Sequence, residues 1–303
     1  MISRSPALHD TTARSSTIRS GASYAVQRVL TEVAFLAVAV VILIWTLLPI
    51  YHMVMLALTP VSDAFAGRFW PDHPTVENFR IVLGQDHFFL QNFWRQLGNS
   101  IFVAVATMVM VLVVASLASY AIGRLKVRYG HVISNAALLT YLIPAAFLAV
   151  PFYVVMAQYG LLNTLWALIF AMSTFAIPYA IWVLRQYGDT IPFELDEAAK
   201  VDGATPVQIF YLVYIPLLRP ALIAIGTYAL LLAWNEYLYA FLLLSTETQH
   251  TIPVAMGYFL VTDDSPWSLL MATAIIYSLP PVALYYAVRK HMVSGLTAGA
   301  TKA

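Results

Sequence analysis

Residues Glu194 to Pro220 read ELDEAAKVDGATPVQIFYLVYIPLLRP and lie between two long apolar stretches. Five of the fifteen acidic residues of this 303-residue chain fall between Asp189 and Asp202. Such clustering stands out in a chain that is 61% hydrophobic and 10% charged. In a short loop between apolar segments, it indicates a surface on which another protein docks rather than a simple linker.

The composition of the chain is that of a membrane protein. A mean hydropathy of +0.76, with sixteen basic and fifteen acidic residues, excludes an ordinary soluble domain. Six apolar runs reach the length of about 20 residues that a helix needs to cross a bilayer. Because they are continuous and do not alternate, they predict helices rather than barrel strands. We therefore expect an all-α integral membrane protein with six transmembrane helices near Val33–Thr59, Ile101–Ile122, Val132–Ala157, Leu165–Leu184, Leu217–Leu244 and Trp267–Val288.

The basic residues predict the orientation of these helices, because cytoplasmic loops carry an excess of Lys and Arg. Only Arg68, Arg80 and Arg95 lie on one side of the predicted topology. The other side holds the remaining thirteen of the sixteen: Arg4, Arg14, Arg19, Arg28, Arg124, Lys126, Arg128, Arg185, Lys200, Arg219, Arg289, Lys290 and Lys302. Both termini are therefore predicted to be cytoplasmic.

Two regions follow from this pattern. Residues 1–30 are rich in Ser, Thr and Arg and are predicted to form a disordered cytoplasmic segment. Residues 31–303 are predicted to form the six-helix transmembrane domain, with a cytoplasmic loop at 189–216. The first apolar run exceeds the core of a signal peptide, about 7–15 residues, and is predicted to be retained. The absence of cysteine excludes disulfides and thiolate metal sites, and no metal site is expected.

The source of energy separates the possible function classes. None of the four lysines follows a glycine, so the chain has no phosphate-binding G-K-[ST] loop of its own. A self-sufficient ion-coupled carrier or channel remains an alternative, although Glu236 is the only carboxylate well inside a predicted span. A membrane-embedded enzyme is a further alternative. It would need clustered Asp or His residues at a helix end, and Asp202-Gly203-Ala204 is only a fragment of such a cluster.

The polar loop itself predicts two short helices joined by a sharp turn. Pro192 suits the start of a helix, whose first turns then hold acidic residues that favour the helix dipole. Gly203 suits a left-handed residue that ends this helix. Thr205 and Gln208 have the spacing of a capping box, with Pro206 at the first helical position.

The same loop carries a family signature. Glu197-Ala198-Ala199 is followed after three residues by Gly203, and after nine more by Val213-Tyr214-Ile215-Pro216. This spacing resembles the loop E-A-A, three residues, G, nine residues, I-x-L-P of permease subunits in binding-protein-dependent ABC importers. The resemblance implies that this loop is a coupling helix, which sits in a cleft of an ATPase subunit. The residues to which it assigns this coupling role are Glu197, Ala198, Ala199, Asp202, Gly203 and Pro216.

Further segments look like the carbohydrate-importer branch of that family. They are Asn99-Ser100, Ser119-Tyr120-Ala121 with Gly123-Arg124-Leu125, and Ala233-Trp234-Asn235-Glu236-Tyr237. The ending Gly295-Leu296-Thr297-Ala298-Gly299 is similar to that of the maltose-type second permease subunit. For that ending, the resemblance implies a contact with the ATPase through Gly295, Leu296, Thr297 and Gly299.

The resemblance also implies an assembly in the bacterial cytoplasmic (inner) membrane, crossed several times by this chain. The expected partners are a second homologous permease subunit, two ATPase subunits, an extracytoplasmic solute-binding protein and the lipid bilayer, with no nucleic acid. ATP and magnesium would be bound by the ATPase subunits, and no cofactor by this chain. The chain would therefore be a transport subunit rather than an enzyme.

The fifth predicted span contains a candidate translocation path. Trp234, Asn235, Glu236 and Tyr239 bring aromatic, amide and carboxylate groups to membrane depth, and such groups bind sugars by stacking and hydrogen bonding. On a continuous helix, positions 235 and 239 share one face. The alternative is that Asn235 and Glu236 join this helix to a second permease subunit by hydrogen bonds.

Overall fold

The structure is a computed structural model that describes the backbone of residues 12–261 and 265–300, and the side chains of residues 27–261 and 265–290. Within these residues all regular structure is helical, which confirms the all-α prediction. The elements are α1 Thr12–Ala57, η1 Val61–Asp63, α2 Glu77–Gly84, η2 Phe88–Leu90, α3 Phe93–Gly123, α4 Gly130–Ala137, η3 Leu138–Leu142, η4 Ala145–Leu148, α5 Ala149–Gln158, α6 Leu165–Gly188, α7 Glu194–Val201, α8 Pro206–Ile209, η5 Phe210–Tyr214, α9 Ile215–Leu217, α10 Arg219–Trp234, α11 Leu238–Leu243, α12 Ile252–Tyr258 and α13 Trp267–Ala300.

The chain divides into two compact units, residues 1–55 and 56–303. The first unit contains most of α1, whose apolar side chains between Val29 and Ile50 are exposed. Residues 12–30 belong to the segment predicted to be disordered, yet they are helical in the structure. A helix nucleated in the adjoining apolar run extends at little cost, since each added residue gains one hydrogen bond. Residues 1–11 lie outside the described part of the chain.

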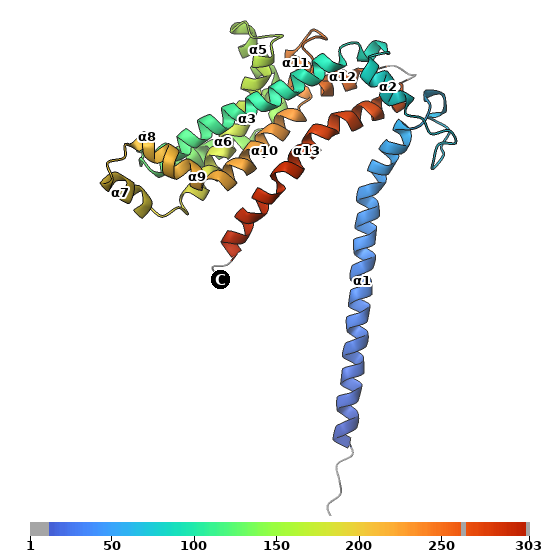
Figure 1. Ribbon diagram of the computed structural model, residues 1–303, viewed down its shortest axis with the longest axis horizontal. Helices are drawn as coiled ribbons and strands as arrows, with labels where there is room; N and C mark the ends of the chain where they lie inside the picture. Colours follow the sequence, from blue (N-terminus) through green and yellow to red (C-terminus); the bar gives the residue numbers. More distant parts are fainter. Residues whose placement is uncertain (1–11, 262–264, 301–303) are drawn as a thin grey trace, which may run out of the picture. The chain divides into compact units, whose positions relative to one another are not determined.

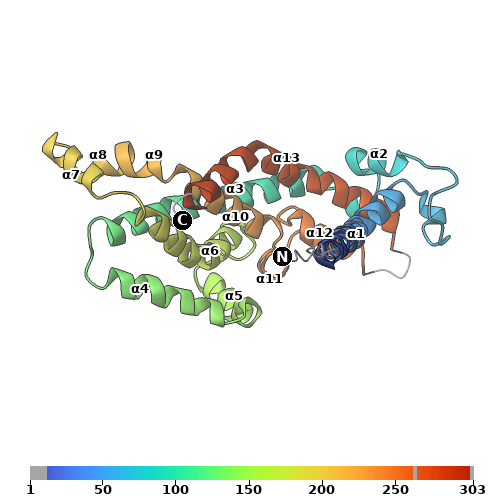
Figure 2. The same ribbon diagram turned by 90° about the horizontal axis from the view of Figure 1, so that it is seen from below.

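The second unit is built around α3, α6 and α10, which run side by side (Figures 1 and 2). Ala115 on α3 and the pair Ala176 and Ala180 on α6 are fully buried in one cluster with Ala229 of α10. Small residues at these positions let the helix backbones approach closely, which is how membrane helices gain packing energy without a hydrophobic drive between them.

One predicted span is broken at a proline. The run expected as one helix over Val132–Ala157 consists of two helical pieces, Gly130–Leu142 and Ala145–Gln158, that meet at an angle of 92°. Between them Ile143 is extended, with φ −90° and ψ 117°. Proline disfavours the helical region for the residue before it, so Pro144 forces this conformation on Ile143.

A second predicted span, Leu217–Leu244, is broken twice. Helical residues Pro206–Leu217 meet α10 at an angle of 78°, because Pro220 has no amide hydrogen and its ring would clash with the carbonyl four residues earlier. The chain leaves the helix again after Trp234 and re-enters it at Leu238. In the described residues, four straight helices are long and apolar enough to cross a membrane. If each of the two bent pairs also counts as one span, the number of candidate spans is six.

The two ends of the second unit gather different loops. At one end, the last turn of α3 lies beside the segment from α6 to α9, the predicted coupling loop (Figure 2). At the other end, the first turns of α3 contact the loop between α11 and α12. The helix α3 therefore extends from one loop cluster to the other.

Candidate functional site: the α7–α9 coupling loop

The helix α7 ends in a left-handed turn at Gly203, as the sequence predicted. Gly203 has φ +84° and donates its amide hydrogen to the Lys200 carbonyl at 3.0 Å. Ala204 donates to the Ala199 carbonyl at 2.9 Å. These two bonds together form the Schellman arrangement that closes a helix C-terminus. A residue with a side chain would be strained by about 1–2 kcal/mol in this left-handed conformation.

The next helix begins with the predicted capping box. Thr205 Oγ1 accepts from the Gln208 amide at 3.3 Å, and Gln208 Oε1 accepts from the Thr205 amide at 2.8 Å. Pro206 stands at the start of α8. The expectation for Pro192 was less accurate, because α7 begins two residues later, at Glu194. Helix, turn and helix are therefore fixed by local bonds, independently of any partner.

The two faces of this loop differ in what they expose. Of the residues assigned to coupling, Glu197, Ala198, Asp202, Gly203 and Pro216 are exposed and Ala199 is half-buried. Among the exposed apolar side chains of the same segment, Val201 is 89% exposed and Val207 is 65% exposed. The junction of α7 and α8 thus presents backbone, small residues and isolated valines to the outside.

The opposite face of α7 holds a buried ion pair that the sequence analysis missed. Asp196 Oδ2 lies 3.5 Å from Nε of Arg124, the residue that follows α3, and the two side chains are 4% and 3% exposed. Removing one partner of such a pair leaves an unpaired buried charge, which costs about 3–5 kcal/mol. From the sequence, Arg124 was named for its place in the topology and in the segment Gly123-Arg124-Leu125, and Asp196 lay among the acids at the start of a helix, without any pairing between them.

Arg124 contacts other groups besides the Asp196 carboxylate. Its Nη2 donates to the carbonyls of Ile191 at 2.8 Å and of Gly188 at 3.3 Å, where α6 ends. Its guanidinium carbon lies 4.6 Å from the ring centre of Phe193 and 5.6 Å from that of Tyr214. A guanidinium group suits this role, because it is planar, always charged and able to donate several hydrogen bonds at once.

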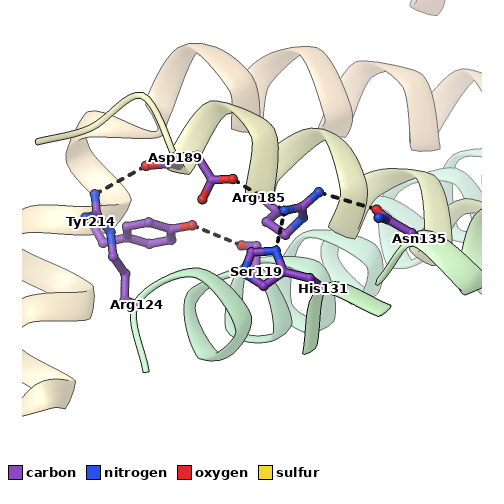
Figure 3. Close-up of polar contacts among 8 residues, drawn as sticks. Ser119, Arg124, His131, Asn135, Arg185, Asp189 and Tyr214 are labelled. Atoms are coloured by element: carbon purple, nitrogen blue, oxygen red, sulfur yellow. Dashed lines mark hydrogen bonds and ion pairs between the residues drawn. The ribbon is translucent and has the colours of Figure 1, made fainter. Parts of the chain in front are cut away.

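Two tyrosines complete the attachment of the loop to α3. Tyr120 Oη donates to the Pro206 carbonyl at 2.8 Å. Tyr214 Oη donates to Ser119 Oγ at 3.4 Å, as Figure 3 shows. Tyr214 is 1% exposed and lies against Gly188, where an added Cβ would come within 3.1 Å of the Tyr214 Cζ. Glycine at position 188 is therefore required by close packing rather than by backbone conformation.

A second arginine, Arg185 on α6, joins α4 to the same end of the molecule. Its Nη1 lies 2.7 Å from His131 Nδ1, and its Nη2 donates to Asn135 Oδ1 at 3.4 Å (Figure 3). Asp189, one turn further along, lies 3.4 Å from Nη1. The two buried arginines, Arg124 and Arg185, therefore hold the ends of several helices together at this end of the second unit.

The candidate translocation path needs a correction of its geometry. Positions 235 and 239 were expected on one face of a continuous helix, but the helix ends at Trp234 and restarts at Leu238. Trp234 is 4% exposed and stacks on Tyr277 at 4.5 Å, while Tyr239 is 2% exposed and donates to the Ala145 carbonyl at 2.7 Å. Both aromatic residues belong to the packed core.

The polar residues at this break have separate environments. Asn235 is exposed and donates to the Leu231 carbonyl at 2.9 Å. Glu236 Oε1 accepts from the Tyr239 amide at 2.7 Å, so it caps the first turn of α11. That cap explains how a carboxylate is accommodated at this depth, a role that the sequence analysis did not consider. The tail residues 295–297 and 299 lie in the last turns of α13, where only the backbone is described.

Residues 115–297 match the family described as binding-protein-dependent transport system inner membrane component. The chain belongs to this family. The matched residues include both arginines, the capped turn and the break after Trp234. Members of this family are transport subunits of ABC transporters, so this permease is not itself an enzyme, and it is a component of the inner membrane.

Named relatives and a solved structure agree with this placement. The permease is 32% identical to the inner membrane ABC transporter permease protein YcjP of Escherichia coli over 91% of this chain and 98% of that protein. It is 34% identical to the trehalose transport system permease protein SugB of Mycobacterium tuberculosis, over 85% and 93% of the two chains. A chain of a bacterial ABC transporter involved in alginate import shares the fold, with a TM-score of 0.71 and 23% identity over 94% of this permease and 99% of that chain.

Proposed function

We propose that this permease is one of two membrane subunits of an ATP-driven importer for a carbohydrate. The names of several relatives support a carbohydrate as cargo: SugB transports trehalose, and the relative DasC of Streptomyces coelicolor takes up diacetylchitobiose. The family description supports an external binding protein. ATP and magnesium would be held by two ATPase subunits, and alternating access between the two permeases would move the cargo inward.

The observation that carries the coupling part of this proposal is the outward face of the α7–α8 junction. At this tight, fully capped turn, the exposed side chains of Val201 and Val207 lie next to the motif residues Glu197 to Gly203. Small apolar side chains beside accessible backbone fit the close approach of a second protein. We infer that these residues sit in a cleft of the ATPase subunit on the cytoplasmic side.

The docking proposal is tested by placing a charge on this face. We expect Val201→Glu to release the ATPase subunits from the purified complex, since a buried carboxylate without a partner is costly at an interface. Val127→Glu is the matched control: Val127 is 50% exposed in the α3–α4 connection and takes no part in the proposed docking. Retention of ATPase and normal uptake in Val201→Glu would contradict the assignment.

For the translocation path, we propose a narrower set of residues than the four named from the sequence. Irregular backbone within a membrane is tolerated where it is buried in protein or lines a water-filled cavity. The break at Asn235–Tyr237 is irregular backbone of this kind within a predicted span, and the exposed Asn235 amide is available to hydrogen-bond a sugar. In this proposal Trp234 and Tyr239 support the break, and Glu236 fixes the direction of α11.

A further inference from the structure

The contacts of Arg124 place one side chain where the end of α6, the α6–α7 connection, α7 and η5 meet. It binds the Gly188 carbonyl at the end of α6, the Ile191 carbonyl in the connection and the Asp196 carboxylate on α7. The ring of Tyr214 in η5 lies beside the same guanidinium. Since Arg124 directly follows α3, all of these elements are attached to the end of one long helix.

The ion pair within this cluster is directional in a way that apolar packing is not. Buried ion pairs contribute little net stability compared with well-packed apolar side chains, but they fix which groups lie next to each other. Phe193 and Tyr214 already fill the apolar space around the guanidinium. The charge on Asp196 therefore adds a fixed attachment of α7 to α3 rather than bulk to the core.

The opposite end of α3 is attached to the loop between α11 and α12 by a comparable set of hydrogen bonds. Asn99 Nδ2 donates to the carbonyls of Thr248 at 3.0 Å and His250 at 2.9 Å. Ser100 Oγ accepts from the Ile252 amide at 2.9 Å, where α12 begins. A displacement of α3 along its axis would thus move the segment before α12 at one end and α7 at the other.

We propose that Arg124 and Asp196 are positioning residues that make α3 move with α7. Through this pair, a push on the coupling helix is passed to α3 and from there to the loop between α11 and α12. The inference rests on the proposed docking of α7 to an ATPase. Its distinct content is that the transfer depends on the buried charge pair, and not only on the exposed docking face.

The test uses the complete complex of permeases, ATPases and binding protein in proteoliposomes. Asp196→Asn removes the charge with little change in shape, Asp196→Glu keeps it, and Arg128→Gln is the matched control, because Arg128 is an exposed arginine in the same connection. Three quantities are measured: ATPase subunits retained on purification, basal ATP hydrolysis, and the stimulation of hydrolysis by the sugar-loaded binding protein.

We expect Asp196→Asn to retain the ATPase subunits and basal hydrolysis, because the asparagine carbonyl can still accept from Arg124 and the guanidinium keeps its bonds to Ile191 and Gly188. The stimulation of hydrolysis by the binding protein should fall about tenfold. Asp196→Glu should recover most of that stimulation, and Arg128→Gln should match the wild-type complex. Normal stimulation in an assembled Asp196→Asn complex would overturn the proposal. Loss of the ATPase subunits in Asp196→Asn, with Arg128→Gln intact, would also overturn it, since the pair would then serve assembly. The Val201→Glu variant tests the docking proposal separately: if that variant keeps its ATPase subunits, the docking proposal fails, whatever Asp196→Asn does.

Discussion

Asn235 and Tyr239 lie four positions apart in the sequence, but one side chain is exposed and the other is buried. Asn235 is exposed at the end of α10, whereas Tyr239 is 2% exposed and packs against Phe152 and Phe175 with ring centres 5.6 and 5.2 Å away. Substitutions at the two positions should therefore fail in different ways, one by losing a contact to cargo and the other by losing the fold around it.

We expect Asn235→Ala to reduce sugar uptake severalfold while the complex purifies intact, because only one exposed hydrogen-bonding group is lost. Tyr239→Ala should instead lower the yield of folded protein, since truncating a buried aromatic residue costs about 3–5 kcal/mol. Uptake kinetics and subunit stoichiometry of each variant check this. Unchanged uptake in an intact Asn235→Ala complex would remove Asn235 from the path.

Single residues differ in how far the sequence determines their role. Gly203 and Thr205 were predictable, since left-handed turns and capping boxes depend on a few neighbouring residues. The pairing of Arg124 with Asp196 was not, because it joins positions on two helices and depends on tertiary packing. The available signals were a charged residue directly after an apolar helix and an acid on the inner face of α7.

At the scale of elements, the loop Ser245–Thr251 is held in place by the side-chain amides of Asn163, in the connection between α5 and α6, and of Gln96 on α3. Asn163 Oδ1 accepts from the amides of Ser245 at 3.0 Å and Thr246 at 3.1 Å, and Gln96 Nε2 donates to the Glu247 carbonyl at 3.3 Å. His250 is 3% exposed and stacks on Tyr258 with ring centres 5.5 Å apart. The buried His250 ring therefore adds an aromatic contact to the amide bonds that hold this loop.

Acidification should loosen this loop. Burial lowers the pKa of His250 from its ordinary value of 6.5, against smaller opposing effects of a backbone hydrogen bond at Leu244 and of the Glu247 carboxylate. The open loop then binds a proton more readily than the closed one, so closure is stable above that value and is weakened as the pH falls below it. Hydrogen-exchange protection of residues 245–251, corrected for intrinsic rates, should be lower at about pH 5 than at about pH 7.5.

His250→Gln should remove this pH response, because glutamine does not titrate. His87→Gln is the control: burial also lowers the pKa of His87, but that residue lies before η2 and outside the loop. A loop that keeps its protection at acidic pH, or loses it equally in His250→Gln, would show that His250 is not responsible.

The helix breaks show where element prediction from sequence reaches its limit. Pro178 stays inside α6, whereas Pro144 separates two helical pieces by 92°. A neighbour helps the first case, since Tyr141 Oη donates to the Phe175 carbonyl at 2.6 Å, in the turn that Pro178 disturbs. Whether a proline bends or breaks a membrane helix depends on such tertiary partners, which a single sequence does not reveal.

At the scale of the whole molecule, the orientation in the membrane remains a prediction from charge. It rests on the thirteen-to-three distribution of basic residues, and the structure adds that the predicted cytoplasmic loops of the second unit lie together at one end. The four straight spans were predictable from length and hydropathy, while the two bent ones were predicted as straight.

Single cysteines in this cysteine-free chain test the orientation. Val76→Cys and Val261→Cys, at positions 71% and 76% exposed, should react with an impermeant thiol reagent added to intact cells. Val127→Cys should react only after permeabilisation, and Val201→Cys only after permeabilisation and removal of the ATPase. Labelling of Val127→Cys in intact cells would reverse the orientation and with it the proposed ATPase contact.

The bent pairs also bear on how the chain is made. Residues Gly130–Leu142 and Ala145–Gln158 are each shorter than the roughly 20 residues that a straight crossing requires, and they meet at 92°. Taken as a separate helix, neither piece is long enough to cross the bilayer by itself. Tyr141 finds its acceptor, Phe175, only once α6 has been synthesised. Membrane integration of this region is therefore expected to wait for a later segment, so that the order of synthesis and the order of insertion differ.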